Sequence, residues 1–240
     1  MNVDAFKARL NAIRSSIVEA TERAGRSDTV TLVAVSKTVE VEHVRAAINA
    51  GQLIFGENRV QEAVAKMDAL RDDDDDVSWH LLGHVQSNKV KTLVGRFACV
   101  QSVDSLRIAT ELNKRAEATG VSLPVLLEVN VAGEASKSGF DLETVQRESG
   151  AITELSALRV HGLMTVAPLV ADAEEVRWVF RRLRELRDSI RERHGFDGLI
   201  DLSMGMSNDY QVAIEEGATI VRIGRAVFGD RPIASKVRHT

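Results

Sequence analysis

Several residue types are scarce in the sequence, and each scarcity excludes a class of protein. One cysteine, Cys99, stands among 240 residues, which excludes intramolecular disulfides and cysteine-rich zinc sites and fits a reducing cytoplasm. Lysine and arginine total 31 against 35 acidic residues, for a net charge of −4, so there is no basic footprint for nucleic acid. No apolar run approaches the roughly 20 residues that span a bilayer, and the N-terminus lacks the apolar core of a signal peptide.

No segment rich in proline, glycine or serine divides the chain, which holds only three prolines. We therefore expect one domain over residues 1–240, in a cytoplasmic protein that binds neither membrane nor nucleic acid. Residues 3–24 carry apolar side chains at helical spacing and predict an N-terminal helix.

After this helix, short β-branched runs alternate with amphipathic stretches. The runs predict strands at 30–35, 53–55, 78–82, 97–101, 125–131, 159–164, 199–202 and 219–223. The stretches between them predict helices at 41–50, 59–70, 88–94, 105–119, 142–155, 174–193 and 208–216. About eight βα units in a chain of this length are typical of a single (β/α)8 TIM-type barrel, here with an extra N-terminal helix; an open doubly wound sheet is the alternative.

In such a barrel the chemistry lies at the carboxyl ends of the strands. Lys37 follows the first strand, and partial burial at the barrel mouth would lower the pKa of its amine. A neutral amine there can attack a carbonyl and form a Schiff base. On position alone, a lysine that simply reaches solvent from a strand end is the alternative.

Two loops of small residues follow the last two strands, at 203–207 (SMGMS) and 223–226 (IGRA). In many barrels these loops build a phosphate site from backbone N–H groups, and Ser203 could add a hydroxyl donor. Two turns whose glycines serve only positive φ are the alternative. A lysine and a phosphate cradle across one barrel mouth suggest an aldehyde or ketone that bears a phosphate.

Six stretches together resemble the pyridoxal phosphate homeostasis proteins, which share the alanine racemase N-terminal barrel fold. The stretches are AVSKT (34–38), FGENRVQE (55–62), WHLLGHVQSNK (79–89), EVNVAGEASKSGF (128–140), HGLMTV (161–166) and LSMGMSNDYQVAIEEGATIVRIGRAVFG (202–229). The resemblance implies that Lys37 carries pyridoxal 5′-phosphate (PLP) as an internal aldimine. It also implies that the protein buffers PLP and delivers it, transiently meeting apo forms of PLP-dependent enzymes.

The resemblance implies further contacts to the coenzyme. These are phosphate contacts from Ser203, Gly224 and the backbone of Arg225, a place beside the pyridine nitrogen for Arg222, and a lining of the ring or aldimine by Asn58 and Met164. The family often has threonine where Arg225 stands, and the sequence leaves open whether Arg225 supplies a charge to the phosphate or points to solvent.

A guanidinium at the ring nitrogen would keep that nitrogen unprotonated and weaken the ring as an electron sink. We therefore expect a carrier without established turnover, active as a monomer. A PLP-dependent amino-acid racemase is the first alternative, although Tyr210 is the only tyrosine and lies outside the strand ends. A Schiff-base aldolase for sugar phosphates is the second. No metal is expected, because His84 and His161 lack metal-ligand spacing.

Overall fold

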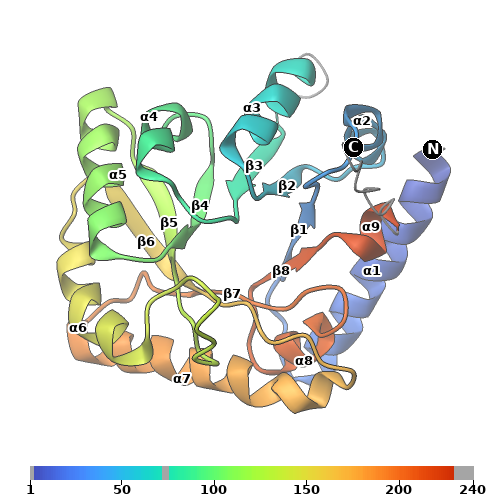
Figure 1. Cartoon of the computed structure of the whole chain (residues 1–240). Coiled ribbons are helices and arrows are strands. Elements are labelled where there is room, and N and C mark those ends of the chain that lie inside the picture. The colour runs from blue at the N-terminus through green and yellow to red at the C-terminus, as the bar shows by residue number, and fades with distance from the viewer. Residues whose placement is uncertain (1–2, 72–75, 230–240) are drawn as a thin grey trace, which may run out of the picture.

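Eight parallel strands close into a barrel in the order β1 to β8, with helices around the outside (Figure 1). The computed structural model describes residues 3–71 and 76–229. The strands are β1 Thr31–Val35, β2 Ile54–Glu57, β3 Ser78–Leu81, β4 Cys99–Val103, β5 Leu123–Glu128, β6 Leu158–Met164, β7 Asp201–Ser203 and β8 Ile220–Ile223. The predicted (β/α)8 barrel is confirmed, and the open sheet is excluded because β1 pairs with β8.

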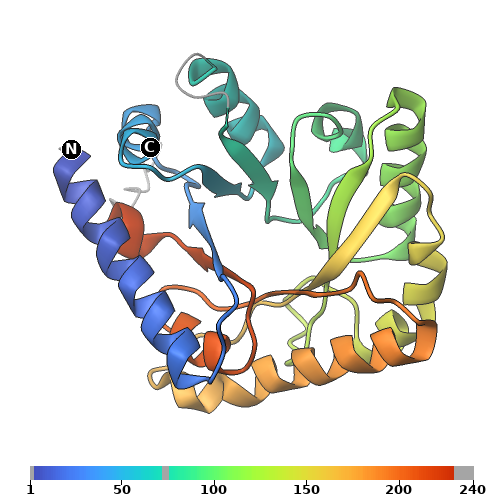
Figure 2. The same cartoon turned by 180° about the vertical axis from the view of Figure 1, so that it is seen from behind.

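The helices follow the strands in the expected alternation. They are α1 Val3–Arg23, α2 Val41–Asn49, α3 Val60–Ala69, α4 Val90–Leu93, α5 Leu106–Thr119, α6 Leu142–Thr153, α7 Arg177–His194, α8 Tyr210–Glu215 and α9 Arg225–Phe228, with short 3-10 turns η1 Ser87–Lys89 and η2 Ala173–Val176. The extra N-terminal helix α1 packs against α2, α8 and α9, where it covers the seam between the first and last strands (Figure 2).

Four strands differ clearly in position from the prediction. β2 runs two residues further than expected, to Glu57. β4 begins two residues later than expected, because the N–H of Phe97 still donates to Leu93 and completes the preceding helical turn. β5 ends at Glu128, because Val129 leaves the barrel to bridge to Phe140. β7 begins at Asp201 and includes Ser203, because Leu199 is held in a turn by Phe196. The short helix α9 was not predicted.

Side chains alternate between the two faces of each strand, as strand geometry requires. Outward residues pack under the helices in the main hydrophobic core. A smaller apolar layer fills the barrel interior: Val33, Cys99, Leu126, Met164 and Ile220. Two residues further toward the carboxyl ends, three of these faces carry polar side chains, Gln101, Glu128 and Arg222, while β1 ends at the apolar Val35. The barrel interior is therefore apolar below, and it carries polar groups toward the carboxyl ends of the strands.

Candidate functional site

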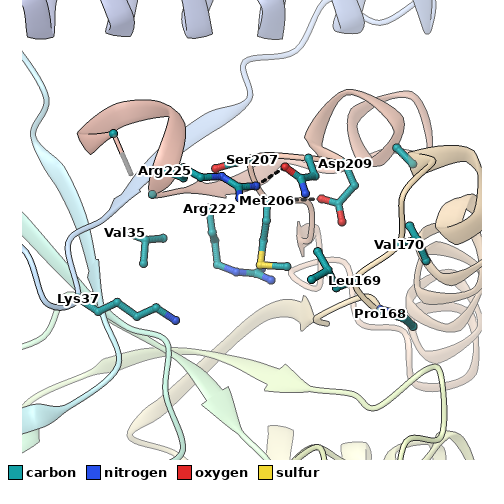
Figure 3. Close-up of a pocket in the computed structure, with 14 residues that line it drawn as sticks. Val35, Lys37, Pro168, Leu169, Val170, Met206, Ser207, Asp209, Arg222 and Arg225 are labelled. Atoms are coloured by element: carbon teal, nitrogen blue, oxygen red, sulfur yellow. Dashed lines mark hydrogen bonds between the residues drawn. The ribbon is translucent and has the colours of Figure 1, made fainter. Parts of the chain in front are cut away.

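A cavity of about 360 Å³ opens at the carboxyl ends of the strands (Figure 3). Its volume falls at the lower end of the range for small-molecule sites. It is lined by residues at or beyond the ends of four strands: Val35 and Lys37 from β1, Pro168, Leu169, Val170 and Ala173 after β6, Met206, Ser207, Asn208 and Asp209 after β7, and Arg222, Gly224, Arg225 and Gly229 from β8 to the residue after α9. Apolar and basic side chains thus meet at the place where parallel barrels bind ligands.

Lys37 is half-buried on the β1 side of the cavity, and its side chain extends toward the side on which Arg222 lies (Figure 3). The next residue, Thr38, has a φ of +60°, a left-handed conformation that is uncommon for a residue other than glycine. This turn lets the backbone reverse directly after Lys37, so that the amine remains at the cavity wall. A strained backbone conformation of this kind persists only when contacts from the surrounding structure hold it.

A buried ion network, which we name the β1-loop clamp, holds both neighbours of Lys37. It consists of Ser36, Glu57, Glu62 and Lys66. The ammonium of Lys66 donates to the backbone oxygen of Ser36 at 2.6 Å, to Glu57 at 2.7 Å and to Glu62 at 2.8 Å. The Ser36 hydroxyl donates to Glu57 at 2.7 Å, and the Thr38 N–H donates to Glu62 at 2.5 Å. The clamp therefore fixes the residues on either side of Lys37 and leaves its side chain to face the cavity.

The two carboxylates of the β1-loop clamp have different surroundings. Glu57 is fully buried, and its Oε2 has no hydrogen-bond partner within the described part of the chain. Burial raises the pKa of Glu57 despite the facing Lys66. Burial acts in the same sense on Glu62, but the donors Lys66 and Thr38 outweigh it and lower the pKa of that carboxyl. Lys66 is therefore the cation that keeps a charge on Glu57 tolerable in the fold.

Arg222 forms the inner wall of the cavity and is only 4% exposed. Its Nη1 donates to the hydroxyl of Ser203 at 2.6 Å, and its Nη2 donates to the backbone oxygen of Thr165 at 2.7 Å. Burial lowers the pKa of Arg222 to about 10, opposed by the carboxylates of Glu128 and Asp209. At neutral pH the cavity therefore presents a fixed positive charge.

The loops after β7 and β8 are tied to each other. The N–H of Ala226 donates to the Ser207 hydroxyl at 3.4 Å, and Arg225 donates to Asn208. Gly205 has a φ of +92°, and a Cβ there would lie 2.8 Å from the Cα of Tyr210, so this position requires glycine. The two loops therefore lie together beside the cavity, and Ser207, Gly224 and Arg225 are among its lining residues; we name these three residues the cradle.

The structure brings together four of the residues that the sequence singled out. Lys37, Arg222, Gly224 and Arg225 line one cavity. The side chain of Arg225 is exposed and donates a hydrogen bond to Asn208. The role of each residue toward a ligand stays a prediction.

Three other candidates do not line this cavity within the described residues. Met164 ends β6 in the apolar layer below it. Asn58 follows β2, where its backbone is packed so closely on Gly83 that a Cβ there would meet the Asn58 oxygen at 2.2 Å.

The predicted loop position of Ser203 is wrong, while its contact with a phosphate stays a prediction. We placed it in a phosphate-binding loop, but it ends β7 with no exposed surface, and its hydroxyl is bonded to Gln101 and Arg222. β7 extends one residue past its predicted end, so Ser203 belongs to the strand. Ser207, in the same SMGMS segment, lines the cavity instead. The sequence signal for Ser207 was its position in the loop itself, two residues after Gly205.

The remaining candidates lie outside the cavity. Cys99 is buried, and burial raises the pKa of its thiol to about 12, so it behaves as a small apolar residue. His84 pairs with Asp104 at 2.6 Å on the surface. Within residues 3–71 and 76–229, no cluster of three or more His, Cys, Asp or Glu side chains could hold a metal ion. None of the described helices is long and apolar enough to cross a membrane.

Comparison with known proteins places this geometry in a family. Residues 8–232 match the family described as alanine racemase, N-terminal domain. The pyridoxal phosphate homeostasis protein of Aquifex aeolicus is 45% identical over 224 residues, which cover 93% of this chain and 97% of the relative. The protein of the same name from Escherichia coli is 39% identical over 232 residues, covering 95% and 97%. The chain belongs to the pyridoxal phosphate homeostasis protein family. The resemblance drawn from six sequence stretches is thereby confirmed.

Solved structures extend this placement. PipY of Synechococcus elongatus, solved without PLP and with PLP bound, is 37% and 36% identical, with TM-scores of 0.85 and 0.83. Both comparisons cover 93% of this chain and 100% of PipY. Alanine racemase of Clostridium difficile has a TM-score of 0.73 at 16% identity, and only 58% of its chain is covered. At this identity, the similarity between this chain and alanine racemase shows a shared fold and nothing more.

Proposed function

We propose that this protein binds PLP in the cavity and holds it through Lys37, whose amine joins the aldehyde carbon as a Schiff base with loss of water. The observation that carries this proposal is the combination in one cavity of a lysine amine, a buried guanidinium and the cradle residues of the two loops after β7 and β8. The PLP-bound structure of the relative PipY supports it.

The residues present fit the chemical groups of PLP. Lys37 stands on one wall for the aldehyde, and Arg222 on the inner wall offers donors to the ring nitrogen, which is an acceptor. Ser207 and the backbone at Gly224 and Arg225 form the cradle on the far side and suit a phosphate, which accepts hydrogen bonds only. We assign the phosphate hydroxyl to Ser207 in place of Ser203, whose oxygen already serves Arg222.

We further propose that the protein stores and releases PLP for apo-enzymes and does not turn over a substrate. When bound, PLP supplies an electron-withdrawing ring whose strength depends on a proton at the ring nitrogen. Arg222 has a pKa of about 10, so it stays charged at neutral pH and donates a hydrogen bond there without giving up a proton. A racemase needs a base on each face of the substrate, and the only tyrosine, Tyr210, donates its hydroxyl to Ser16 of α1 at 3.0 Å.

The test of this proposal is the visible absorbance of the purified protein after incubation with PLP. We expect a band that shifts on borohydride reduction, with one reduced adduct per chain on the peptide that contains Lys37. Lys37→Ala should abolish the adduct, while Lys114→Ala, an exposed lysine on α5, should leave it unchanged. A full adduct in Lys37→Ala would overturn the assignment, and a sugar phosphate trapped in place of PLP would favour the aldolase alternative.

The phosphate assignment has its own test. Ser207→Ala should weaken binding of PLP by about 1–3 kcal/mol and affect pyridoxal, which lacks the phosphate, much less. Equal losses for both ligands would show that Ser207 acts through the shape of the loop. Sustained formation of D-amino acid by the PLP-loaded protein would show that the carrier proposal is wrong and favour a racemase.

A further inference from the structure

We propose that Ser203, Gln101 and His80 form a one-directional hydrogen-bond relay across the barrel interior that orients Arg222 toward the ring nitrogen of the coenzyme. These three are positioning residues, since they act through Arg222. The role toward the coenzyme rests on the proposed function, whereas the hydrogen-bond geometry belongs to the free protein. The two parts are tested separately.

The relay joins four strands that meet only because the barrel is closed. From β8, Arg222 donates to the Ser203 hydroxyl of β7 at 2.6 Å. Ser203 bonds to Oε1 of Gln101 on β4 at 2.6 Å, and Nε2 of Gln101 lies 2.8 Å from Nδ1 of His80 on β3. Strands β4 and β7 are not neighbours in the sheet, so the bond between Gln101 and Ser203 crosses the interior. Ser203 and Gln101 have no exposed surface.

The direction of every bond follows from the charge at one end. A guanidinium has only donors, so the Ser203 oxygen must accept from Arg222. The Ser203 hydrogen is then free for Gln101 and requires the amide oxygen, which turns the amide nitrogen toward His80. Nδ1 of His80 must accept, so the proton of the neutral ring is on Nε2. A flipped Gln101 would set its amide donors against the Ser203 hydroxyl hydrogen, and its oxygen against the lone pair on Nδ1 of His80.

A second anchor completes the orientation of the guanidinium. The Nη2 of Arg222 donates to the backbone oxygen of Thr165 at the end of β6, so the two Nη atoms are held by different strands. A planar fork held at two atoms cannot rotate about its last bond, which fixes the direction in which its remaining donors point into the cavity. Without the relay, the Ser203 hydroxyl loses its acceptor and the first anchor weakens.

The electrostatics of the interior agree with this direction. Burial lowers the pKa of His80 to about 4, so the ring is neutral at physiological pH and able to accept at Nδ1. The carboxylates that face Arg222 are those of Glu128 and Asp209, and the relay itself contains no anion. The permanent charge of Arg222 is therefore the one charge within the relay, and it polarises each bond in the same sense.

The first experiment tests the relay in the free protein, by 15N NMR of the His80 ring, with His80→Gln used to assign its signals. We expect the Nε2–H tautomer, with Nδ1 unprotonated down to pH 5. In Gln101→Glu the carboxylate accepts from both neighbours, so Nδ1 should gain a proton and the pKa of His80 should rise. A wild-type ring protonated at Nδ1 would overturn the relay, whether or not the protein binds PLP.

The second experiment tests its role toward the coenzyme. Gln101→Met should weaken PLP binding by about tenfold, the value of one hydrogen bond, and shift the absorbance maximum of the bound form. For an analogue with CH in place of the ring nitrogen, wild type and Gln101→Met should bind alike. Cys99→Ala, two residues earlier on the same face of β4, serves as the control for loss of packing and should keep the wild-type maximum.

The outcomes separate the two proposals. If wild type binds no PLP, the proposed function fails while the NMR result still stands. If wild type binds PLP and Gln101→Met binds it with equal affinity and an unchanged spectrum, the positioning role is wrong. If Gln101→Met weakens PLP and the CH analogue equally, the relay supports the fold alone and not the ring nitrogen. Loss confined to PLP confirms the inference.

Discussion

Removal of Lys66 should destabilise the protein far more than removal of an ordinary lysine. In Lys66→Met the carboxylate of Glu57 remains fully buried without its cation, and the backbone oxygen of Ser36 loses its donor. Breaking one partner of a buried ion pair costs about 3–5 kcal/mol. We expect that loss in the free energy of unfolding at pH 8, which is a large part of the total stability of a domain.

The loss should depend on pH in a definite direction. The pKa of Glu57 is already raised by burial, and without Lys66 it rises further. A carboxyl with a raised folded pKa makes the native state bind the extra proton, so stability falls as pH rises from its unfolded value through its folded value. The cost of Lys66→Met should therefore be greatest at pH 8 and smaller at pH 5.

Urea denaturation, followed by tryptophan fluorescence, measures this effect, since Trp79 is buried between the barrel and the helices. Glu57→Gln combined with Lys66→Met removes the stranded charge and should regain about 2 kcal/mol or more of the loss. Lys114→Met, on the exposed face of α5, is the control and should change stability little. A loss below about 1 kcal/mol, or no recovery in the double variant, would refute the buried-pair reasoning.

Three further predictions follow from the structure. The Cys99 thiol, with its pKa raised to about 12, should react with a disulfide reagent only at the rate of unfolding; fast reaction in native buffer would contradict its burial. Burial, together with the nearby Asp104, raises the pKa of Glu128 to about 7, so its contribution to stability should decline between about pH 4.5 and 7 and stay level above. Glu128→Gln should remove that slope in urea melts at pH 5 and 8, and an unchanged slope would exclude Glu128 as its source. Gly205→Ala should cost about 1–3 kcal/mol, because a Cβ would lie 2.7 Å from that of Ala213 at a φ of +92°; a neutral effect in the same melts would argue against this loop geometry.

The sequence predicted the barrel because each strand is a short β-branched run between amphipathic helices, and that pattern is local. Once β8 is assigned, strand alternation puts Arg222 on the same inward face as Ile220, two residues earlier. The strand ends do not follow from so local a pattern: β7 extends one residue past its predicted end, so Ser203 belongs to the strand and Ser207 lines the cavity.

The residues that support the site carried no local signal. Gln101 read as an ordinary strand residue, because its partner Ser203 comes near only when the barrel closes. Lys66 and Glu62 have the spacing of a surface helix pair, which normally contributes a few tenths of a kcal/mol. Only the buried Glu57 from β2 turns that pair into part of the β1-loop clamp, and burial of this kind is a property of the tertiary structure.

The pairing of β1 with β8 has a consequence for how the site comes into being. Val33 lies directly opposite Arg222, so the amine side and the guanidinium side of the cavity are brought together by the first and last strands of the barrel. A chain still emerging from the ribosome can form most of the helices and strands, yet it has no complete cavity until its final strand arrives. Pairings so distant in sequence are slow to form. A ligand that contacts both walls would bind only the closed barrel, so it would stabilise the pairing of β1 with β8, and more strongly at higher ligand concentration.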